Sequence, residues 1–198
     1  MMVKICGITN REDALAAIDG GAAALGFNFY PASPRYIEPD DAADIAAGLP
    51  AGVWRVGVFV DESPEAVLRT AVQAGLDIAQ LHGSESPERY PRDIRVWKAI
   101  RVFSKAGDTA CPTIVSEGVE AVLLDGPASG QVFDWARVPR GVEKLILAGG
   151  LHAGNVRAAI GQVHPWGVDA CSQIESSPGR KDRVKMAAFL KAALVESE

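Results

Sequence analysis

Several reactive side chains end short apolar runs in this sequence. Residues 3–6 read Val-Lys-Ile-Cys, and strand alternation places Lys4 and Cys6 on the same face. An ammonium beside a thiol favours the thiolate, so Cys6 could act as a base near neutral pH. Asp125 ends the run 121–125 and His82 ends the run 78–82. Together these groups could move protons to and from a substrate.

Each of these residues also has an ordinary structural interpretation. A cysteine at a strand end is often a small buried hydrophobic residue. Asp125 precedes Gly126 and Pro127, so it could simply form a turn. His82 could end its strand as a hydrogen-bonded residue. Their joint position at the ends of strand-like runs is what favours a functional interpretation.

A phosphate site is expected late in the chain. Gly149 and Gly150 follow the run 144–148, and residues 172–179 follow the run 167–172. Glycines let main-chain N–H groups approach an oxyanion, and a helix N-terminus adds its dipole. Tight turns also use glycine pairs, so this signal is weak by itself. Arg35, within Ser-Pro-Arg-Tyr at 33–36, could hold a carboxylate in a bidentate pair or could be an exposed loop charge.

Metal and cofactor motifs are missing from the sequence. His82, His152 and His164 lack ligand spacing, so we expect chemistry without a metal or cofactor.

Composition limits the classes of partner. The chain has 198 residues, 48% hydrophobic and 23% charged, with a net charge of -5. The acidic balance argues against nucleic-acid binding, which needs clustered Lys and Arg. Three cysteines form no disulfide framework, and no run approaches the roughly 20 apolar residues that span a bilayer. We therefore expect a cytoplasmic protein without membrane or nucleic-acid partners.

Eight strand-like runs alternate with helical patterns along the chain. The runs cover residues 3–6, 24–29, 54–60, 78–82, 95–100, 121–125, 144–148 and 167–172.

Helix signals are clearest at three places. Ser63 and Pro64 begin one helix that ends before Gly75, and Thr9 with Glu12 resembles a capping box. A last helix over 181–195 places apolar side chains on one stripe, namely Met186, Phe189, Leu190, Ala193 and Leu194.

This pattern predicts an α/β fold, a single (βα)8 barrel over residues 1–198. About 25 residues per strand–helix unit is nearly minimal for a closed barrel. The helices after the fifth and sixth strands, within 104–120 and around 134–138, should be short or vestigial. An open doubly wound sheet is the alternative, but its GxGxxG fingerprint is missing. In a barrel, the reactive groups above would meet at the carboxyl ends of the strands.

Motifs along nearly the whole chain resemble the phosphoribosylanthranilate isomerase family. The most specific are KICGITN at 4–10 and QLHG at 80–83. Further matching segments lie at 26–29, 33–36, 56–60, 123–125, 133–135, 148–151, 167–169, 177–179 and 181–182.

The resemblance implies a small phosphate-binding barrel that catalyses an Amadori rearrangement in tryptophan biosynthesis. N-(5-phosphoribosyl)anthranilate would become 1-(2-carboxyphenylamino)-1-deoxyribulose 5-phosphate. Cys6 would be the general base and Asp125 the general acid, which must be protonated and is expected in an enclosed apolar setting. Arg35 would hold the anthranilate carboxylate. The other implied substrate-binding residues are Lys4, His82, Gly149, Gly150, Asp169 and Ser172.

Two departures from the family pattern concern substrate binding. The family's glycine-rich loop after the sixth strand is shortened here to residues 126–132. The family's SSGVE reads CSQIE at 171–175, so Gln173 replaces a glycine.

Two other functions remain open at this point. One is a bifunctional isomerase of histidine and tryptophan intermediates, although such barrels use a pair of aspartates. The other is a barrel that binds phosphate ligands without turnover. In each case the partner is a phosphorylated small molecule, and a monomer is expected because no apolar stripe is left exposed.

Overall fold

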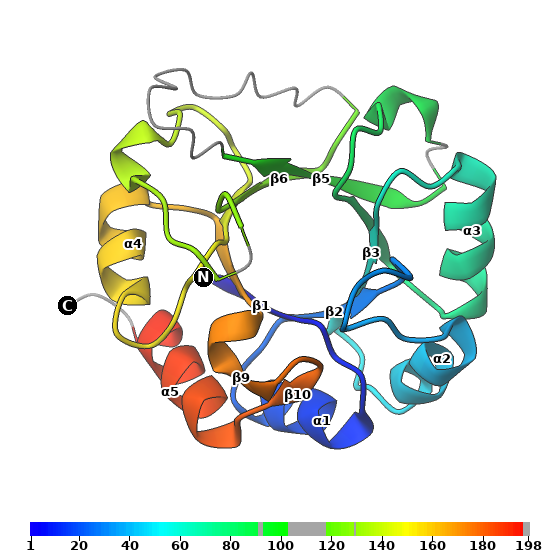
Figure 1. The fold of residues 1–198 in the computed structure, drawn as a ribbon, viewed down its shortest axis with the longest axis horizontal. Helices are drawn as coiled ribbons and strands as arrows, with labels where there is room; N and C mark the ends of the chain where they lie inside the picture. Colours follow the sequence, from blue (N-terminus) through cyan, green and yellow to red (C-terminus); the bar gives the residue numbers. More distant parts are fainter. Residues whose placement is uncertain (91–92, 103–117, 129, 196–198) are drawn as a thin grey trace.

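Eight parallel strands close into a barrel in the order β1 to β8 (Figure 1). The computed structural model describes residues 1–90, 93–102, 118–128 and 130–195. The strands are β1 (Met2–Cys6), β2 (Ala24–Asn28), β3 (Trp54–Phe59), β4 (Ile78–Leu81), β5 (Arg95–Arg101), β6 (Ala121–Asp125), β7 (Leu145–Leu147) and β8 (Gly167–Ala170). The predicted (βα)8 barrel is therefore confirmed, and the open sheet is excluded.

In the part of the chain that the structure describes, five α-helices lie outside the ring of strands (Figure 1). They are α1 (Arg11–Asp19), α2 (Pro39–Ala47), α3 (Pro64–Gln73), α4 (Val156–Val163) and α5 (Arg183–Leu194). A small antiparallel pair, β9 (Glu175–Ser177) and β10 (Arg180–Lys181), joins β8 to α5. Within the described ranges, no helix has the length and apolar character needed to cross a bilayer.

Short 3-10 helices replace α-helices at two points on the ring. The expected vestigial helix after β6 is confirmed as η2 (Trp135–Arg137). The described residues after β4 form only η1 (Pro87–Arg89), a shortening that the sequence pattern did not predict. The expected short helix after β5 falls largely on residues 103–117, outside the described residues. A third 3-10 helix, η3 (Ser172–Ile174), follows β8.

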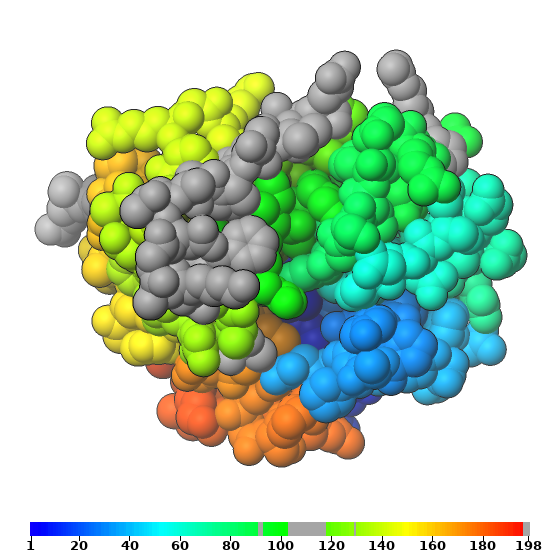
Figure 2. Space-filling model, turned by 45° about the horizontal axis from the view of Figure 1, so that its top comes forward, coloured from blue at the N-terminus to red at the C-terminus, as the bar shows by residue number. Residues whose placement is uncertain are grey.

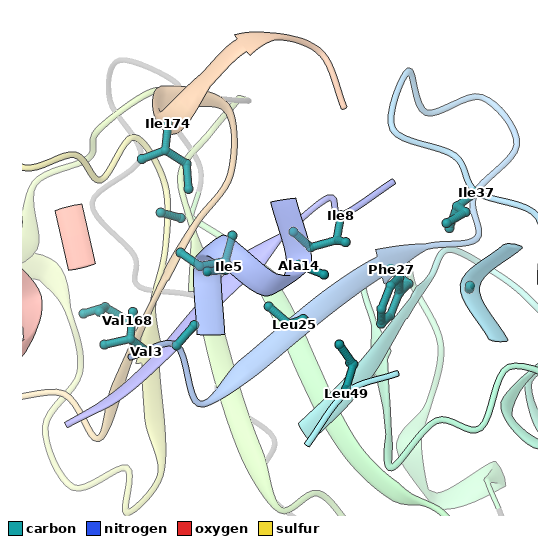
Figure 3. Close-up of a cluster of buried hydrophobic side chains, with 14 of the residues drawn as sticks. Val3, Ile5, Ile8, Ala14, Leu25, Phe27, Ile37, Leu49, Val168 and Ile174 are labelled. Atoms are coloured by element: carbon teal, nitrogen blue, oxygen red, sulfur yellow. The ribbon is translucent and has the colours of Figure 1, made fainter. Parts of the chain in front are cut away.

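Strand alternation divides the core into two layers, as predicted. Val3 and Ile5 pack outward with Leu25, Phe27 and helix residues in the layer shown in Figure 3. On β6, Val122 and Leu124 pack outward, whereas Leu123 belongs to the cluster inside the barrel. This inner cluster also contains Met2, Ala24, Val56, Ile78, Trp97, Ala99, Ala121, Ile146 and Ala148. The alternation that buries these apolar side chains also sends Lys4, Cys6 and Asp125 toward the barrel axis.

The helix caps match the sequence signals only in part. Ser63 accepts a hydrogen bond from the Ala66 amide and begins α3, as predicted. The capping box assigned to Thr9 and Glu12 is wrong: Asn10 caps α1 by accepting from the Asp13 amide, and Thr9 donates to the Gly179 carbonyl.

The last helix starts later than predicted. Asp182 caps α5 with its carboxylate, which accepts from the amides of Val184 and Lys185, so the helix begins at Arg183. Met186, Phe189, Leu190 and Ala193 form the buried stripe, whereas Leu194 is exposed.

Candidate active site

A cavity of about 580 Å³ opens at the carboxyl ends of the strands. In the space-filling view, a recess lies between the blue, green and orange segments (Figure 2). Eight of the nine candidate residues line the cavity: Cys6, Arg35, His82, Asp125, Gly149, Gly150, Asp169 and Ser172. Lys4 is the exception, because its side chain is fully buried below the cavity.

Lys4 supports the cavity wall from beneath. Its ammonium donates a hydrogen bond to Asp169 Oδ1 at 3.0 Å, across the paired positions of β1 and β8. Burial alone would lower the pKa of Lys4, but the charges of Asp169 and Cys6 raise it, so the ammonium is retained. Burial raises the pKa of Asp169 to about 7, against the opposing effect of Lys4.

Cys6 lies at the end of β1 and is 8% exposed to the cavity. A hydrogen bond with the Cys171 thiol lowers the pKa of Cys6 well below its usual value. Burial opposes this shift, and the charges of Lys4 and Lys181 add to it. These groups support the Cys6 thiolate that the spacing of Lys4 and Cys6 predicted. They include a second thiol, Cys171, which the spacing did not reveal.

Asp125 faces His82 across the cavity mouth. Asp125 Oδ2 lies 3.3 Å from His82 Nε2, and Oδ1 accepts a hydrogen bond from the Gly126 amide at 2.8 Å. The Asp125 side chain is 23% exposed, so the enclosed apolar setting expected for it is wrong. A carboxyl group at this position can exchange a proton with a substrate that enters the cavity.

Gln80 extends this polar pair into the barrel. Its Nε2 lies 3.3 Å from His82 Nδ1, so it orients the imidazole ring. Gln80 is buried, and its Oε1 has no hydrogen-bond partner among the described residues. Because this oxygen belongs to a residue that lines the cavity, a substrate hydroxyl could supply the missing donor.

Arg35 is held by a carboxylate of the protein itself. Its Nε donates to both oxygens of Glu175, at 3.0 and 3.1 Å, and its Nη2 donates to Oε2 at 2.7 Å. Glu175 also accepts from Lys181 Nζ at 2.9 Å. Burial works against ionisation of Glu175, but the bonds from Arg35 and Lys181 lower its pKa. Arg35 is therefore held in place in the cavity lining and is not an exposed loop charge.

The two glycines after β7 allow close contact between neighbouring loops. Gly149 and Gly150 have φ angles of 84° and 67°, a region that favours glycine. A Cβ on Gly149 would clash with the Gly126 amide nitrogen, and one on Gly150 would lie 2.8 Å from the Val132 nitrogen. The glycines thus pack the loop after β7 against the shortened loop after β6.

Gln173 joins that shortened loop to the loop after β8. Its Nε2 donates to the Gly130 carbonyl at 2.9 Å, and a Cβ on Gly130 would lie 2.9 Å from Ser172 Oγ. The side chain that replaces a glycine therefore lies along the loop rather than across the cavity floor. Gln173 and Ser172 both line the cavity at this point.

Sequence reasoning missed three polar groups of the site: Cys171, Glu175 and Lys181. Cys171 and Glu175 follow β8 within the segment 171–175, and the register of β1 with β8 could have indicated that Cys171 lies beside Cys6. Glu175 and Lys181 left no such signal, because β9 and β10 are too short to show a period. In the described part of the chain, no group of three His, Cys, Asp or Glu side chains could hold a metal ion.

Fold and site together define a closed (βα)8 barrel in which a thiol on β1 and a carboxyl group on β6 line one cavity at the carboxyl ends of the strands. The family model of N-(5'phosphoribosyl)anthranilate (PRA) isomerase matches residues 3–192. The chain belongs to this isomerase family.

Similar proteins support the same family across the whole chain. The N-(5'-phosphoribosyl)anthranilate isomerase of Solibacter usitatus (strain Ellin6076) is 50% identical over 202 residues, covering 98% of this chain and 97% of the relative. The phosphoribosyl anthranilate isomerase of Thermus thermophilus has a TM-score of 0.88 at 39% identity, with 97% and 98% of the two chains covered.

A second similar structure holds a ligand. It is a phosphoribosyl anthranilate isomerase in complex with reduced 1-(o-carboxyphenylamino)-1-deoxyribulose 5-phosphate. Its TM-score is 0.81 at 40% identity, with 98% of each chain covered.

Proposed function

We propose that this chain converts N-(5-phosphoribosyl)anthranilate into 1-(2-carboxyphenylamino)-1-deoxyribulose 5-phosphate, a step of tryptophan biosynthesis, with Cys6 as general base and Asp125 as general acid. The observation that carries this assignment is the surroundings of Cys6. Its thiol borders the cavity beside Cys171 and above a buried ammonium, and Asp125 lines the same cavity from β6. Family membership supports the reaction, and this geometry supports the roles proposed for the two residues.

Ring opening needs an acid at the ribose ring oxygen. In the proposed step, Asp125 gives its proton to that oxygen while the bond from C1 to the oxygen breaks. The nitrogen lone pair forms the C1–N double bond of the Schiff base. Asp125 is left as a carboxylate, which His82 and the Gly126 amide stabilise.

The second step removes the C2 proton. Cys6 takes it as a thiolate, the electron pair of the C2–H bond forms a C1–C2 double bond, and the π electrons of the C1–N bond return to nitrogen, giving the enolamine. Tautomerisation to the ketone moves the hydroxyl proton of C2 to the solvent or a protein group and adds a proton at C1. Because the positive Schiff base withdraws electrons from C2, a thiolate is a strong enough base for this step.

The rest of the cavity would hold the two charged ends of the substrate. The anthranilate carboxylate would contact Arg35 through guanidinium N–H groups that point away from Glu175. The phosphate would lie against the main chain of Gly149 and Gly150 and the Ser172 hydroxyl, with His82 and Asp169 facing the sugar. Lys4 cannot touch the substrate from its buried position, so its proposed role is to position Asp169 and stabilise the Cys6 thiolate.

The loss of anthranilate-type fluorescence on adding freshly made phosphoribosylanthranilate tests this function. Wild type should turn over rapidly, whereas Cys6→Ala and Asp125→Asn should not. Lack of turnover by wild type that still binds phosphate ligands would instead support a non-catalytic barrel. Additional turnover of the histidine-pathway intermediate would support the bifunctional alternative. Cys6 would then have to take the place of one of the two aspartates that such barrels use.

The remaining parts of the proposal concern the whole protein. Residues 1–198 would form one catalytic domain, since all eight strands close into a single barrel. A reducing, cytoplasmic location suits the free thiols of Cys6 and Cys171. The partner would be the phosphorylated substrate, and the protein would act as a monomer.

A further inference from the structure

Cys6 is the last residue of β1, and Cys171 directly follows the last residue of the neighbouring strand β8. The register of β1 with β8 pairs Lys4 with Asp169 and Ile5 with Ala170. The next pair along both chains is Cys6 and Cys171. Backbones of neighbouring parallel strands lie about 4.8 Å apart, and a disulfide joins Cα atoms about 4.4–6.8 Å apart. A bond between these two sulfurs therefore needs no large movement of the barrel.

The two thiol groups also point into the same space. A Cβ on Gly26 would lie 2.8 Å from Cys6 Sγ, and a Cβ on Gly7 would lie 3.0 Å from Cys171 Sγ. The absence of a side chain on Gly7 and Gly26 leaves room for the sulfurs beside the strand ends. The two thiols share a hydrogen bond, and both residues line the cavity. Small molecules that enter the cavity can therefore reach both sulfurs.

The surroundings of this thiol pair are electropositive. Lys4 lies beneath Cys6, and a Cβ on Gly26 would be 3.1 Å from its Nζ. Lys181 Nζ lies 3.9 Å from Cys171 Sγ, and Arg35 lines the same wall. These cations favour the thiolate of Cys6, whereas the hydrogen bond with Cys6 and burial raise the pKa of Cys171, which also lies 3.9 Å from Glu175 Oε1. The Cys6 thiolate is the form that oxidants attack.

We propose that Cys6 and Cys171 are a redox modification site, in which a peroxide entering the cavity converts the two thiols into a reversible disulfide. The disulfide would leave no thiolate at Cys6 to act as the base, and it would join the end of β1 to the residue that follows β8. The effect on activity rests on the function proposed for Cys6, whereas formation of the disulfide does not.

The chemistry requires one equivalent of hydrogen peroxide. The Cys6 thiolate attacks one peroxide oxygen, the O–O bond breaks, and Cys6 becomes a sulfenic acid while hydroxide leaves. Cys171 sulfur then attacks the Cys6 sulfur, and the sulfenic hydroxyl leaves as water with the proton of Cys171. Two electrons pass from the two sulfurs to the peroxide. Lys181 assists the second step, because its ammonium stabilises negative charge developing on Cys171.

The experiment uses the full chain with Cys111→Ser, because the third cysteine lies outside the described residues and would otherwise complicate the count of thiols. This protein is treated with hydrogen peroxide, and its intact mass and turnover are measured before and after dithiothreitol. We expect the intact mass to fall by the mass of two hydrogens. Turnover should fall by more than about tenfold, since general-base catalysis contributes at least that much. Dithiothreitol should restore both.

The matched control adds Cys171→Ser, and its turnover is compared with that of its own reduced form. Without a resolving thiol, Cys6 should gain oxygen atoms, and prolonged oxidation should become irreversible. Gain of oxygen instead of loss of hydrogens in the Cys111→Ser protein would overturn the proposed thiol pair.

A disulfide that leaves turnover unchanged would have a different meaning. It would retain the modification site but reject Cys6 as the base. The mass and the turnover therefore distinguish failure of the thiol pair from failure of the proposed function.

Discussion

Cys6 lies among groups that determine its protonation. Cys171 lowers its pKa through a hydrogen bond, burial opposes this shift, and Lys4 and Lys181 add their charges. Burial without these partners would give an inert thiol. The same sequence feature, a cysteine at a strand end, thus supports two interpretations, and only its neighbours in space decide between them.

Replacing the base should affect catalysis more than binding. Cys6→Ala should lower kcat by about 10²–10⁴-fold, the usual contribution of a general base. The dissociation constant of reduced 1-(o-carboxyphenylamino)-1-deoxyribulose 5-phosphate, measured by calorimetry, should change little, because the base acts mainly in the transition state. Near-normal kcat in Cys6→Ala would reject this assignment.

The second thiol should set the acidic limb of the pH–rate profile. Activity needs the Cys6 thiolate, so it is present above the pKa of Cys6 and is lost as the pH falls through it. Cys171→Ala removes the hydrogen bond that lowers this pKa, so the acidic limb of kcat/KM should move to higher pH. Cys171→Ser keeps a donor and should move the limb less. If the acidic limb of kcat/KM lies at the same pH in wild type, Cys171→Ala and Cys171→Ser, then Cys171 does not act on the base.

Arg35 should affect substrate affinity. Arg35→Ala should raise KM strongly with a smaller change in kcat, because the proposed contact is with a carboxylate distant from the reacting carbons. Arg69→Ala, on the exposed face of α3, serves as the matched control and should leave KM unchanged. An unchanged KM in Arg35→Ala would place the carboxylate contact elsewhere in the cavity.

At the scale of elements, the amino ends of the strands form a separate stabilising cluster. Trp54 stacks on Trp166 with ring centroids 5.9 Å apart, and Trp97 meets both rings edge-on. Arg95 lies 4.7 Å above the Trp54 ring, and Lys144 lies 5.5 Å from the centre of the Trp166 ring. This cluster closes the barrel opposite the cavity, so its substitution should change stability without touching the reaction.

Glu120 should give this cluster a pH-dependent contribution. It pairs with Arg95 and Lys144, and the bond from Arg95 lowers its pKa to about 2 despite partial burial. Because the pKa of the folded state is below the ordinary value of 4.5, the stabilisation is complete above about pH 4.5 and is lost as the pH falls toward 2. The pair is partly exposed, so we expect Glu120→Gln to cost about 1 kcal/mol or less at pH 7.

Urea denaturation at two pH values tests this contribution. The difference in unfolding free energy between wild type and Glu120→Gln should be larger at pH 7 than at pH 3, provided that both proteins fold at pH 3. High salt should reduce the difference at pH 7. A difference that is equal at both pH values would mean that the carboxylate charge is not the cause.

Elements with a clear period were predictable, and elements held by tertiary contacts were not. The alternation on β1 and β6 predicted which side chains face the axis, and Ser63 with Pro64 marked the start of α3. The cap at Asn10 was missed because Thr9 is engaged by the distant Gly179 carbonyl. The described residues after β4 form only the three-residue helix η1, which is too short to show a helical period.

At the scale of the whole molecule, strand order carried most of the site prediction. Because parallel strands in a barrel end at the same face, Cys6 on β1, His82 after β4 and Asp125 on β6 were expected together, and all three line one cavity. Pairings across the ring were not predictable in the same way. Arg35 with Glu175 joins residues 140 positions apart, and only the closed barrel brings them together.

The closed barrel also predicts that the protein is a monomer in solution. Large exposed apolar side chains in the described part of the chain include Val72 on α3, Val132 after β6 and Val184 on α5, which belong to separate elements. A stable interface buries about 800 Å² on each partner around an apolar centre, which scattered single residues do not provide. Light scattering after size-exclusion chromatography should therefore give a mass near 20.9 kDa.

A dimer is the specific alternative to this prediction. A mass near twice that of one chain, independent of salt, would show that this chain dimerises through an apolar contact. In that case, Glu substitutions at Val72, Val132 and Val184, tested one at a time, should reveal the interface, because a charge buried in it would shift the equilibrium toward monomers.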